Sequence, residues 1–307
     1  MANHTFTVIG AACGWGGRRR KSERGPAVLE DYALVGKLTG QGVKTTWHST
    51  IKLPETQADY GSLTPEETLP FVTRFNRELV SAIKALPTSK DAPIPMVIGG
   101  DHSVAMGTWS AITSARGAEG KFGLIWLDAH LDAHTPATAH EGRWGGYYHG
   151  RPVAVLLGHG EPELTGLGST RAKISPQNLT IIGARSYEPG EQKLLESLGV
   201  RIVYMDEVRR RGFAEVFAEA MQRATNGTSG FGLSIDLDGF DPSEAPGTGT
   251  NEENGLHAKD VLPVLKGVGQ HPQFCGVEVT EFHPDRDANN YTANLVIKLL
   301  QAVGASA

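Results

Sequence analysis

Short apolar runs alternate along this chain with longer stretches of helical periodicity. Each run has the length and residue types of a buried β-strand. The runs fall at residues 5–10, 43–47, 95–98, 122–127, 178–183, 201–204, 231–235 and 274–280. Because helical segments lie between them, the alternation predicts an α/β fold in which helices cover both faces of a mostly parallel sheet.

The helical stretches carry recognisable start signals. Thr64-Pro65-Glu66-Glu67 is a capping box with proline in the first turn, and Pro26 opens another expected helix. Further helices are expected at 190–197, 207–224, 258–267 and 287–302. The longest irregular stretch is 133–152, and loops of that length in a compact α/β domain are usually functional.

Bulk composition narrows the class of protein. No linker, repeat or break in composition interrupts residues 1–307, so we expect one domain. The net charge of −5 argues against a nucleic-acid-binding surface. Only Cys13 and Cys275 occur, which fits a reducing compartment rather than a disulfide framework. Because the first residues lack a secretory signal and no run is long enough to span a membrane, a cytoplasmic location without a membrane partner is expected.

Two acidic strings accompany the apolar runs at 122–127 and 231–235. The first is Asp128-Ala129-His130-Leu131-Asp132, and the second ends in Asp236-Leu237-Asp238. In an extended chain, residues i, i+2 and i+4 point to one face, so the acidic side chains of each string are expected to project together. Four carboxylates gathered at one place would repel each other strongly unless a cation held them.

The donor atoms of these strings indicate a dinuclear metal centre. Carboxylate oxygens with some imidazole suit Mn²⁺, and they also accept Mg²⁺, Zn²⁺, Co²⁺ or Ni²⁺. Two divalent ions balance four carboxylates in formal charge. A pair of ions about 3.5–4 Å apart can ionise a bridging water, so the strings predict metal-assisted hydrolysis without a covalent enzyme intermediate.

Two more motifs are expected at the same edge of the sheet, because ligands of open α/β sheets collect at the carboxyl ends of the strands. Gly99-Gly100-Asp101-His102-Ser103 follows the run at 95–98 and makes His102 a candidate ligand. Asp101 fits either a ligand or a helix cap. Glu281 follows the run at 274–280, and it fits either a surface carboxylate or a group that recognises a cationic substrate.

These motifs together resemble those of the arginase (ureohydrolase) family. They are Gly-Gly-Asp-His-Ser at 99–103, Asp-Ala-His-Leu-Asp at 128–132, Ser-Ile-Asp-Leu-Asp-Gly-Phe-Asp-Pro at 234–242 and Glu-Phe-His-Pro at 281–284. The resemblance spans nearly the whole chain. It implies a single three-layer αβα domain with a central parallel sheet of about eight strands. It also implies two Mn²⁺ ions, with Ni²⁺ or Co²⁺ as alternatives, and a homo-oligomer that is a trimer or a hexamer.

The resemblance further implies roles for individual residues. One ion would be held by His102, Asp128, Asp132 and Asp236, and the other by Asp128, His130, Asp236 and Asp238. A hydroxide bridging the ions would attack the guanidinium carbon of a small guanidino substrate, with Asp132 accepting a hydrogen bond from the hydroxide and Glu281 pairing with the guanidinium. His149 matches the family's loop histidine, which shuttles protons. The products would be urea and an amine.

The tail of the substrate is less constrained. Glu188 and Glu191 are candidates for binding an ammonium group, and Thr250 lies in a turn-rich loop that can present hydroxyl groups. His134 stands where arginases usually carry asparagine. The loop at 139–148 is longer than expected for an arginase, and its aromatic residues either narrow the pocket or pack within the loop. These aromatic residues are Trp144, Tyr147 and Tyr148.

Three hypotheses follow from these motifs. The favoured one is hydrolysis of L-arginine to L-ornithine and urea. The second is a sibling hydrolase that acts on agmatine, a guanidino acid or a small guanidine. The third, ranked lowest because every expected ligand position is filled, is a metal-binding subunit that has lost catalysis.

Overall fold

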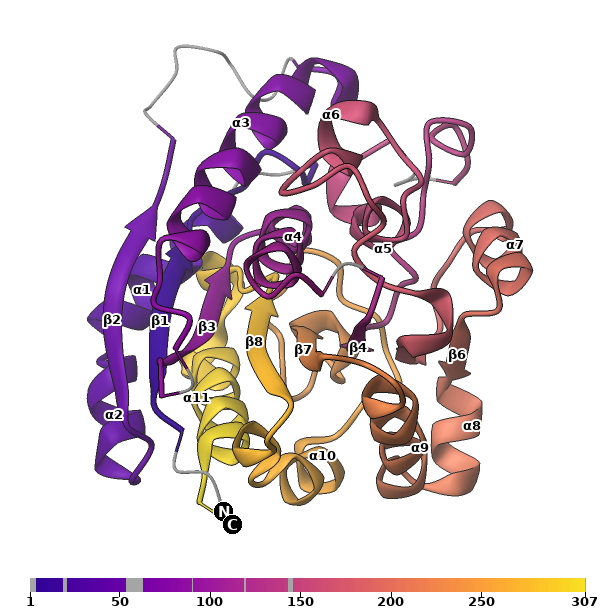
Figure 1. The fold of residues 1–307 in the computed structure, drawn as a ribbon. Helices are drawn as coiled ribbons and strands as arrows, with labels where there is room; N and C mark the ends of the chain where they lie inside the picture. The colour runs from indigo at the N-terminus through magenta and orange to yellow at the C-terminus, as the bar shows by residue number, and fades with distance from the viewer. Residues whose placement is uncertain are drawn as a thin grey trace.

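The computed structural model describes residues 4–18, 21–53, 63–89, 91–118, 120–142 and 146–306. An eight-stranded sheet runs through its centre in the order β2-β1-β3-β8-β7-β4-β5-β6, from left to right in Figure 1. All neighbouring strands in this sheet pair in parallel, which confirms the predicted α/β class. The strands are β1 (Phe6–Ala11), β2 (Thr45–Ile51), β3 (Ile94–Gly99), β4 (Phe122–Leu127), β5 (Leu179–Ala184), β6 (Arg201–Tyr204), β7 (Gly230–Asp236) and β8 (Phe274–Thr280).

Each expected apolar run forms a strand, but β2 begins two residues later and ends four residues later than expected. The run was expected at 43–47, whereas the strand extends to Ile51. This strand lies at the edge of the sheet, and most of its side chains are at least partly exposed. Apolar periodicity therefore could not mark its end, which is set by backbone pairing with β1.

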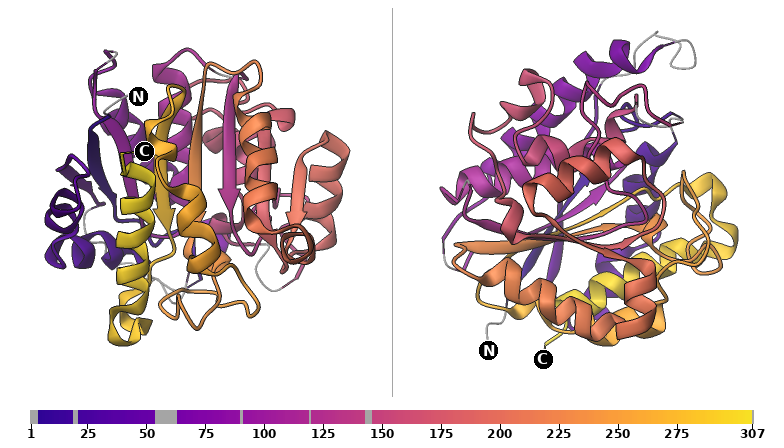
Figure 2. Two further views of the ribbon diagram at one scale, coloured as in Figure 1. Left: turned by 90° about the horizontal axis from the view of Figure 1, so that it is seen from below. Right: turned by 90° about the vertical axis from the view of Figure 1, so that its right-hand side faces the viewer.

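Two layers of helices enclose the sheet, one on each face, and each layer packs its own apolar core against it (Figure 2). One layer contains α1 (Gly25–Asp31), α2 (Leu34–Gly40), α8 (Met205–Arg211), α9 (Phe213–Thr225), α10 (Ala258–Leu265) and α11 (Tyr291–Gly304). The other contains α3 (Pro65–Lys84), α4 (Ala105–Ala115), α5 (Pro152–Leu156), α6 (Pro162–Thr165) and α7 (Pro189–Leu198).

Local signals set the start of α3 as predicted. The backbone N–H of Glu67 donates to Thr64 Oγ1, and the backbone N–H of Thr64 donates to the Glu67 carboxylate. These two bonds satisfy donors that have no partner within the first turn of a helix. The apolar stripe of α3 is buried, and the helix packs against α4 and the edge strand β2.

Two of the expected helices have different bounds. The helix expected at 207–224 is wrong as a single element, because Gly212 has a φ of 85° and separates α8 from α9. The helix expected at 287–302 begins only at Tyr291, since Asn289 and Asn290 have φ values of 55° and 56°. Left-handed backbone of this kind ends regular α-helix on either side.

The order of the strands positions the site. The strands β3, β8, β7 and β4 are consecutive neighbours in the sheet, and each is followed at its carboxyl end by one of the chemistry-bearing motifs. Motifs that lie far apart in the sequence therefore meet above four adjacent strands. No helix among the described residues is long and apolar enough to cross a membrane. The single domain expected over residues 1–307 stays a prediction.

Candidate metal centre

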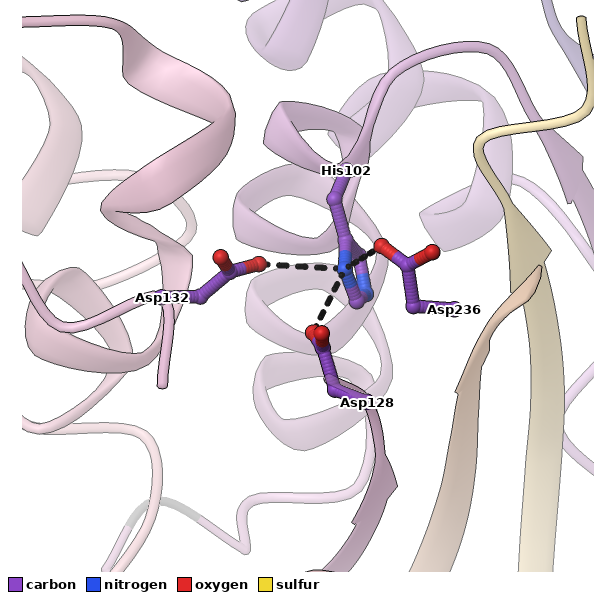
Figure 3. A group of neighbouring side chains, drawn as sticks. All are labelled: His102, Asp128, Asp132 and Asp236. Carbon is purple, nitrogen blue, oxygen red and sulfur yellow. Dashed lines mark ion pairs between the residues drawn. The ribbon is translucent and has the colours of Figure 1, made fainter. Parts of the chain in front are cut away.

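His102 lies at the centre of a buried group of three aspartates (Figure 3). Its Nδ1 atom is 2.8 Å from Asp236 Oδ2, 3.1 Å from Asp132 Oδ2 and 3.4 Å from Asp128 Oδ2. The four residues follow or end the strands β3, β4 and β7, and their side chains point toward one another. The first predicted ligand set is thus brought together in space.

The hydrogen bonding of this group is incomplete in a way that suits a cation. One imidazole nitrogen carries at most one proton and cannot donate to three carboxylate oxygens. In the described part of the chain, His102 Nδ1 and Asp132 Oδ2 are buried without a hydrogen-bond partner. Burial opposes a charge on His102, but the aspartates raise its pKa well above the ordinary value. The pocket therefore attracts positive charge, and its nitrogen and oxygen donors fit a divalent metal ion.

The backbone reaches this arrangement by turns rather than by extended strand. We expected Asp128, His130 and Asp132 to share one face of a continued strand, but β4 ends at Leu127. Asp132 then has a φ of 48°, in the left-handed region, and this turn directs its carboxylate back toward His102. A non-glycine residue in that conformation is strained and is often found at functional sites.

A second group of potential ligands adjoins the first. His130 Nδ1 lies 3.4 Å from Asp128 Oδ1 and 3.3 Å from Asp238 Oδ2. Asp128 belongs to both groups, whereas Asp236 is close only to the first. Asp236 Oδ1 accepts a hydrogen bond from the Asp238 backbone N–H at 2.9 Å. The expected role of Asp236 toward both ions stays a prediction.

Thr250 supports the second group. Its hydroxyl donates to Asp238 Oδ2 over 2.6 Å, and its side chain also lines the cavity above the centre. Thr250 was expected to contact the substrate. Its hydrogen bond shows that it also orients a carboxylate of the candidate metal centre.

Glu281 and His149 form a pair beside the centre. His149 Nδ1 lies 3.2 Å from Glu281 Oε1, which also accepts a hydrogen bond from the His102 backbone N–H at 2.8 Å. Burial opposes a charged His149, but Glu281 outweighs it and raises the pKa of His149 to about 9. Burial likewise opposes the Glu281 carboxylate, but His149 lowers its pKa below the ordinary value. The two groups therefore favour an ion pair at neutral pH.

The three residues predicted for the substrate tail also lie together. His134 Nε2 is 3.2 Å from Glu188 Oε2 and 3.3 Å from Glu191 Oε2. His134 and Glu191 are buried, and burial raises the pKa of Glu191 to about 8 while it lowers the pKa of His134. This trio sits beside the metal-ligand candidates in one small cavity.

Two adjoining cavities give access to these groups. The inner cavity has a volume of about 40 Å³. It is lined by His102, His130, Asp132, His134, His149, Gly150, Ser186, Glu188, Glu191, Asp236, Asp238 and Thr250. The outer cavity, of about 720 Å³, is lined by Glu281 and shares His149 and Thr250 with the inner one. The two cavities thus meet beside the candidate metal ligands, at His149 and Thr250.

Comparison with known proteins identifies the family. A model of the "Arginase family" matches residues 4–305. This chain belongs to the arginase family. Its members are hydrolases that act on the carbon–nitrogen bonds of linear amidines.

Individual relatives match the chain over nearly its full length. An arginase from Brevibacillus brevis is 31% identical over 303 residues, which are 98% of this chain and 98% of that protein. The native arginase structure from Bacillus caldovelox has a TM-score of 0.88 and 29% identity, covering 100% of this chain and 99% of that one. An Entamoeba histolytica arginase in complex with L-ornithine has a TM-score of 0.86 and 26% identity, covering 99% of this chain and 100% of that one.

In this member of the arginase family, several residues around the centre escaped the sequence analysis. His102 Nε2 lies 3.0 Å from Ser234 Oγ, and that hydroxyl donates to Glu278 Oε1 at 3.0 Å. Trp126 stacks on the His102 ring with centroids 4.2 Å apart, and its indole N–H donates to Asp128 Oδ2. Such partners orient the groups that bind a metal. Ser234 begins the motif at 234–242, but its position in the sequence does not reveal its contact with His102. Trp126 lies in the apolar run at 122–127, where nothing separates it from an ordinary core residue.

The structure also shows the contacts of Asp101 and of the aromatic residues in the loop at 139–148. Asp101 is a cap, because its carboxylate accepts hydrogen bonds from the backbone N–H groups of Ser103 and Gly16, both at 2.9 Å. In the loop at 139–148, Tyr148 is buried and Tyr147 lies edge-on to His149, with centroids 6.2 Å apart. Trp144 lies outside the described residues.

Proposed function

We propose that this chain hydrolyses L-arginine to L-ornithine and urea at a dinuclear metal centre, in one catalytic domain that spans residues 1–307. The single observation that carries the proposal is the buried His102 Nδ1 atom, which has no hydrogen-bond partner and faces oxygens of three carboxylates. Membership of the arginase family supports the reaction, and the name of the Entamoeba histolytica complex supports the amino-acid tail.

The residues that would hold the metal ions are those of the two adjoining groups. His102, Asp128, Asp132 and Asp236 would hold one ion, and Asp128, His130 and Asp238 the other. Asp236 is assigned to the second ion as well, on the family resemblance alone. The chemistry such ions supply when bound is activation of water for attack on the guanidinium carbon. We propose Mn²⁺, with Ni²⁺ or Co²⁺ as alternatives, because carboxylate oxygens and imidazole nitrogens bind all three ions.

The chain's own residues orient the substrate and move the protons. Glu281 pairs with the guanidinium group, because it is a buried carboxylate beside the centre and keeps its charge. His149 holds a proton on its ring and can pass it to the departing amine. Asp132 accepts a hydrogen bond from the attacking water. At the other end, Glu188 and Glu191 with His134 receive the ammonium group of the tail, and Thr250 orients Asp238.

A second candidate is a sibling activity on agmatine or another guanidine. Among the described residues that line the inner cavity, none is lysine or arginine, whereas several are carboxylates. This lining therefore offers partners for an ammonium group but no lysine or arginine as a partner for a carboxylate, so the tail of agmatine would leave none of its polar groups unpaired there. The choice between L-arginine and agmatine depends on this difference.

Urea release from a panel of guanidino compounds tests the proposal. The panel consists of L-arginine, agmatine, a guanidino acid and guanidine, each with the purified protein and added Mn²⁺. We expect urea mainly from L-arginine, and little in the presence of a chelator. If only another guanidine gave urea, that compound would be the substrate in place of L-arginine. If the metal-loaded protein released no urea from any compound, the proposed hydrolase activity would be wrong.

We also propose a homo-oligomer, a trimer or a hexamer, in the cytoplasm. The family resemblance supports the assembly. The location is supported by two buried cysteines that form no disulfide, as expected in a reducing compartment.

A further inference from the structure

The loop at residues 135–142 lies against the start of α7. Glu141 Oε2 accepts a hydrogen bond from the backbone N–H of Gly190 at 2.7 Å. Gly190 is in the first turn of α7, where backbone N–H groups have no partner within the helix. A carboxylate is also favoured there by the helix dipole. Glu141 therefore fastens this loop to α7.

The same loop contacts two of the side chains assigned to the substrate tail. Thr138 Oγ1 lies 3.1 Å from His134 Nδ1. Gly142 lies so close to Glu188 that a Cβ atom added to it would be 1.8 Å from Glu188 Oε1. The φ of Gly142 is 59°, a backbone conformation that other residues rarely adopt. The loop thus holds His134 from one side and Glu188 from the other.

We propose that Glu141 is a positioning residue that sets the preference of this enzyme for a substrate tail bearing an ammonium group. The inference rests on the proposed function. Glu141 is not among the described residues that line the inner cavity, so it acts through others. By fastening the loop it keeps His134 and Glu188 in contact, 3.2 Å apart, with the carboxylate of Glu188 facing the cavity. Release of the loop removes the contact of Thr138 with His134 and that of Gly142 with Glu188, and leaves both side chains with fewer constraints.

A pair of substrates that differ only in the ammonium group tests this inference. L-Arginine is compared with 5-guanidinopentanoate, which has hydrogen in place of the α-ammonium group. In Glu141→Ala we expect KM for L-arginine to rise about tenfold, since a charge-assisted contact is weakened, with kcat nearly unchanged. KM for 5-guanidinopentanoate should stay at the wild-type value. Glu141→Gln keeps an acceptor oxygen for Gly190 and should restore most of the affinity.

The controls separate positioning from general damage. Glu215→Ala removes an exposed glutamate from the first turn of α9 and should leave both KM values unchanged. Should Glu141→Ala lose its circular dichroism signal, Gly142→Ala replaces it, because its Cβ must displace Glu188 and raise KM for L-arginine selectively. Calorimetric titration with L-ornithine and 5-aminopentanoate repeats the comparison without turnover.

Three results would overturn the inference. An equal rise in KM for both substrates would show a general effect on the site. An unchanged KM for L-arginine in the folded Glu141→Ala variant, with normal wild-type turnover, would refute the role of Glu141 and leave the proposed function intact. Absence of urea from every guanidine with the metal-loaded wild type would refute both.

Discussion

The orientation of His102 depends on residues that are not themselves candidate ligands. Ser234 Oγ lies 3.0 Å from Nε2 of this ring, and the hydroxyl proton is directed to Glu278. In the neutral ring the proton therefore lies on Nε2, whose N–H donates a hydrogen bond to Ser234 Oγ, and the lone pair of Nδ1 faces the aspartates. The stacked indole of Trp126 fixes the plane of the ring. The chain Glu278–Ser234–His102 thus selects the tautomer that binds a metal.

Ser234→Ala tests this role at a single residue. We expect the affinity for Mn²⁺ to fall about 10- to 100-fold, because the ring loses the partner that fixes its tautomer. Calorimetric titration of the metal-free protein with Mn²⁺ measures the change. Ser81→Ala is the control, since its hydroxyl only donates to the Arg77 carbonyl on an exposed face of α3. Equal affinities for wild type and Ser234→Ala would show that the tautomer is set elsewhere.

For single residues, the sequence predicts which side chains are candidate ligands better than it predicts the backbone conformations that bring them together. The spacing of Asp128, His130 and Asp132 identified the candidate centre, yet the spacing was explained by a continued strand that does not exist. The left-handed backbone of Asp132 cannot be inferred from an aspartate in isolation. Glu281, with a φ of 65°, is a second case of the same kind. Such conformations are imposed by the surrounding structure.

Among the secondary-structure elements, the helix predicted at 207–224 is divided by Gly212 into α8 and α9. The φ of Gly212 is 85°, and a Cβ atom added to it would meet no atom within 4 Å. Gly212→Ala should therefore lower the free energy of unfolding by about 1–3 kcal/mol through backbone strain alone. Gly40→Ala, at the helical end of α2 and equally free of contacts, should instead raise it by up to about 1 kcal/mol. Urea unfolding of both variants measures the two shifts, and equal effects of the two substitutions would contradict the prediction.

Elements with a strong local signal were predictable, and those defined by tertiary contacts were not. The buried strands and the capped start of α3 follow from apolar runs and from Thr64 with Glu67. The edge strand β2 and the break at Gly212 follow from pairing and packing that no local pattern encodes. Glycine alone is a weak signal, because the chain contains 38 of them.

For the whole molecule, the sequence predicts a parallel sheet but not the order of its strands. The order β3-β8-β7-β4 brings the Glu281 carboxylate to the backbone of His102 across 179 residues of sequence. The requirement for a shared metal and the position of the motifs at the carboxyl ends of strands indicated that they meet, without giving the order of the strands. The chemistry of the motifs thus predicts which residues form the candidate site, whereas the proposed place of the substrate tail depends on the resemblance to the family.

The buried acids make the stability of the whole metal-free protein depend on pH. Burial, followed by the charge of Asp128, raises the pKa of Asp132 from 3.8 to about 7. Because the folded-state value lies above that of an unfolded chain, protonation stabilises the fold. The contribution is fully present below pH 3.8 and is lost as the pH rises through about 7. Between pH 3.8 and about 7, metal-free protein should therefore lose the stability that protonated Asp132 contributes.

A comparison with Asp132→Asn isolates this effect, because asparagine keeps the shape and does not titrate. In the presence of a chelator, the free energy of unfolding of the wild type should fall more steeply than that of the variant between about pH 5 and 7, by up to about 1.4 kcal/mol per pH unit. Added Mn²⁺ should remove the fall in the wild type, since metal binding requires ionised carboxylates and at 100 times its Kd adds about 2.7 kcal/mol of stability. Denaturant unfolding at three pH values gives both slopes. Parallel slopes for wild type and variant without metal would show that the fold does not raise the pKa of Asp132, and would contradict this prediction.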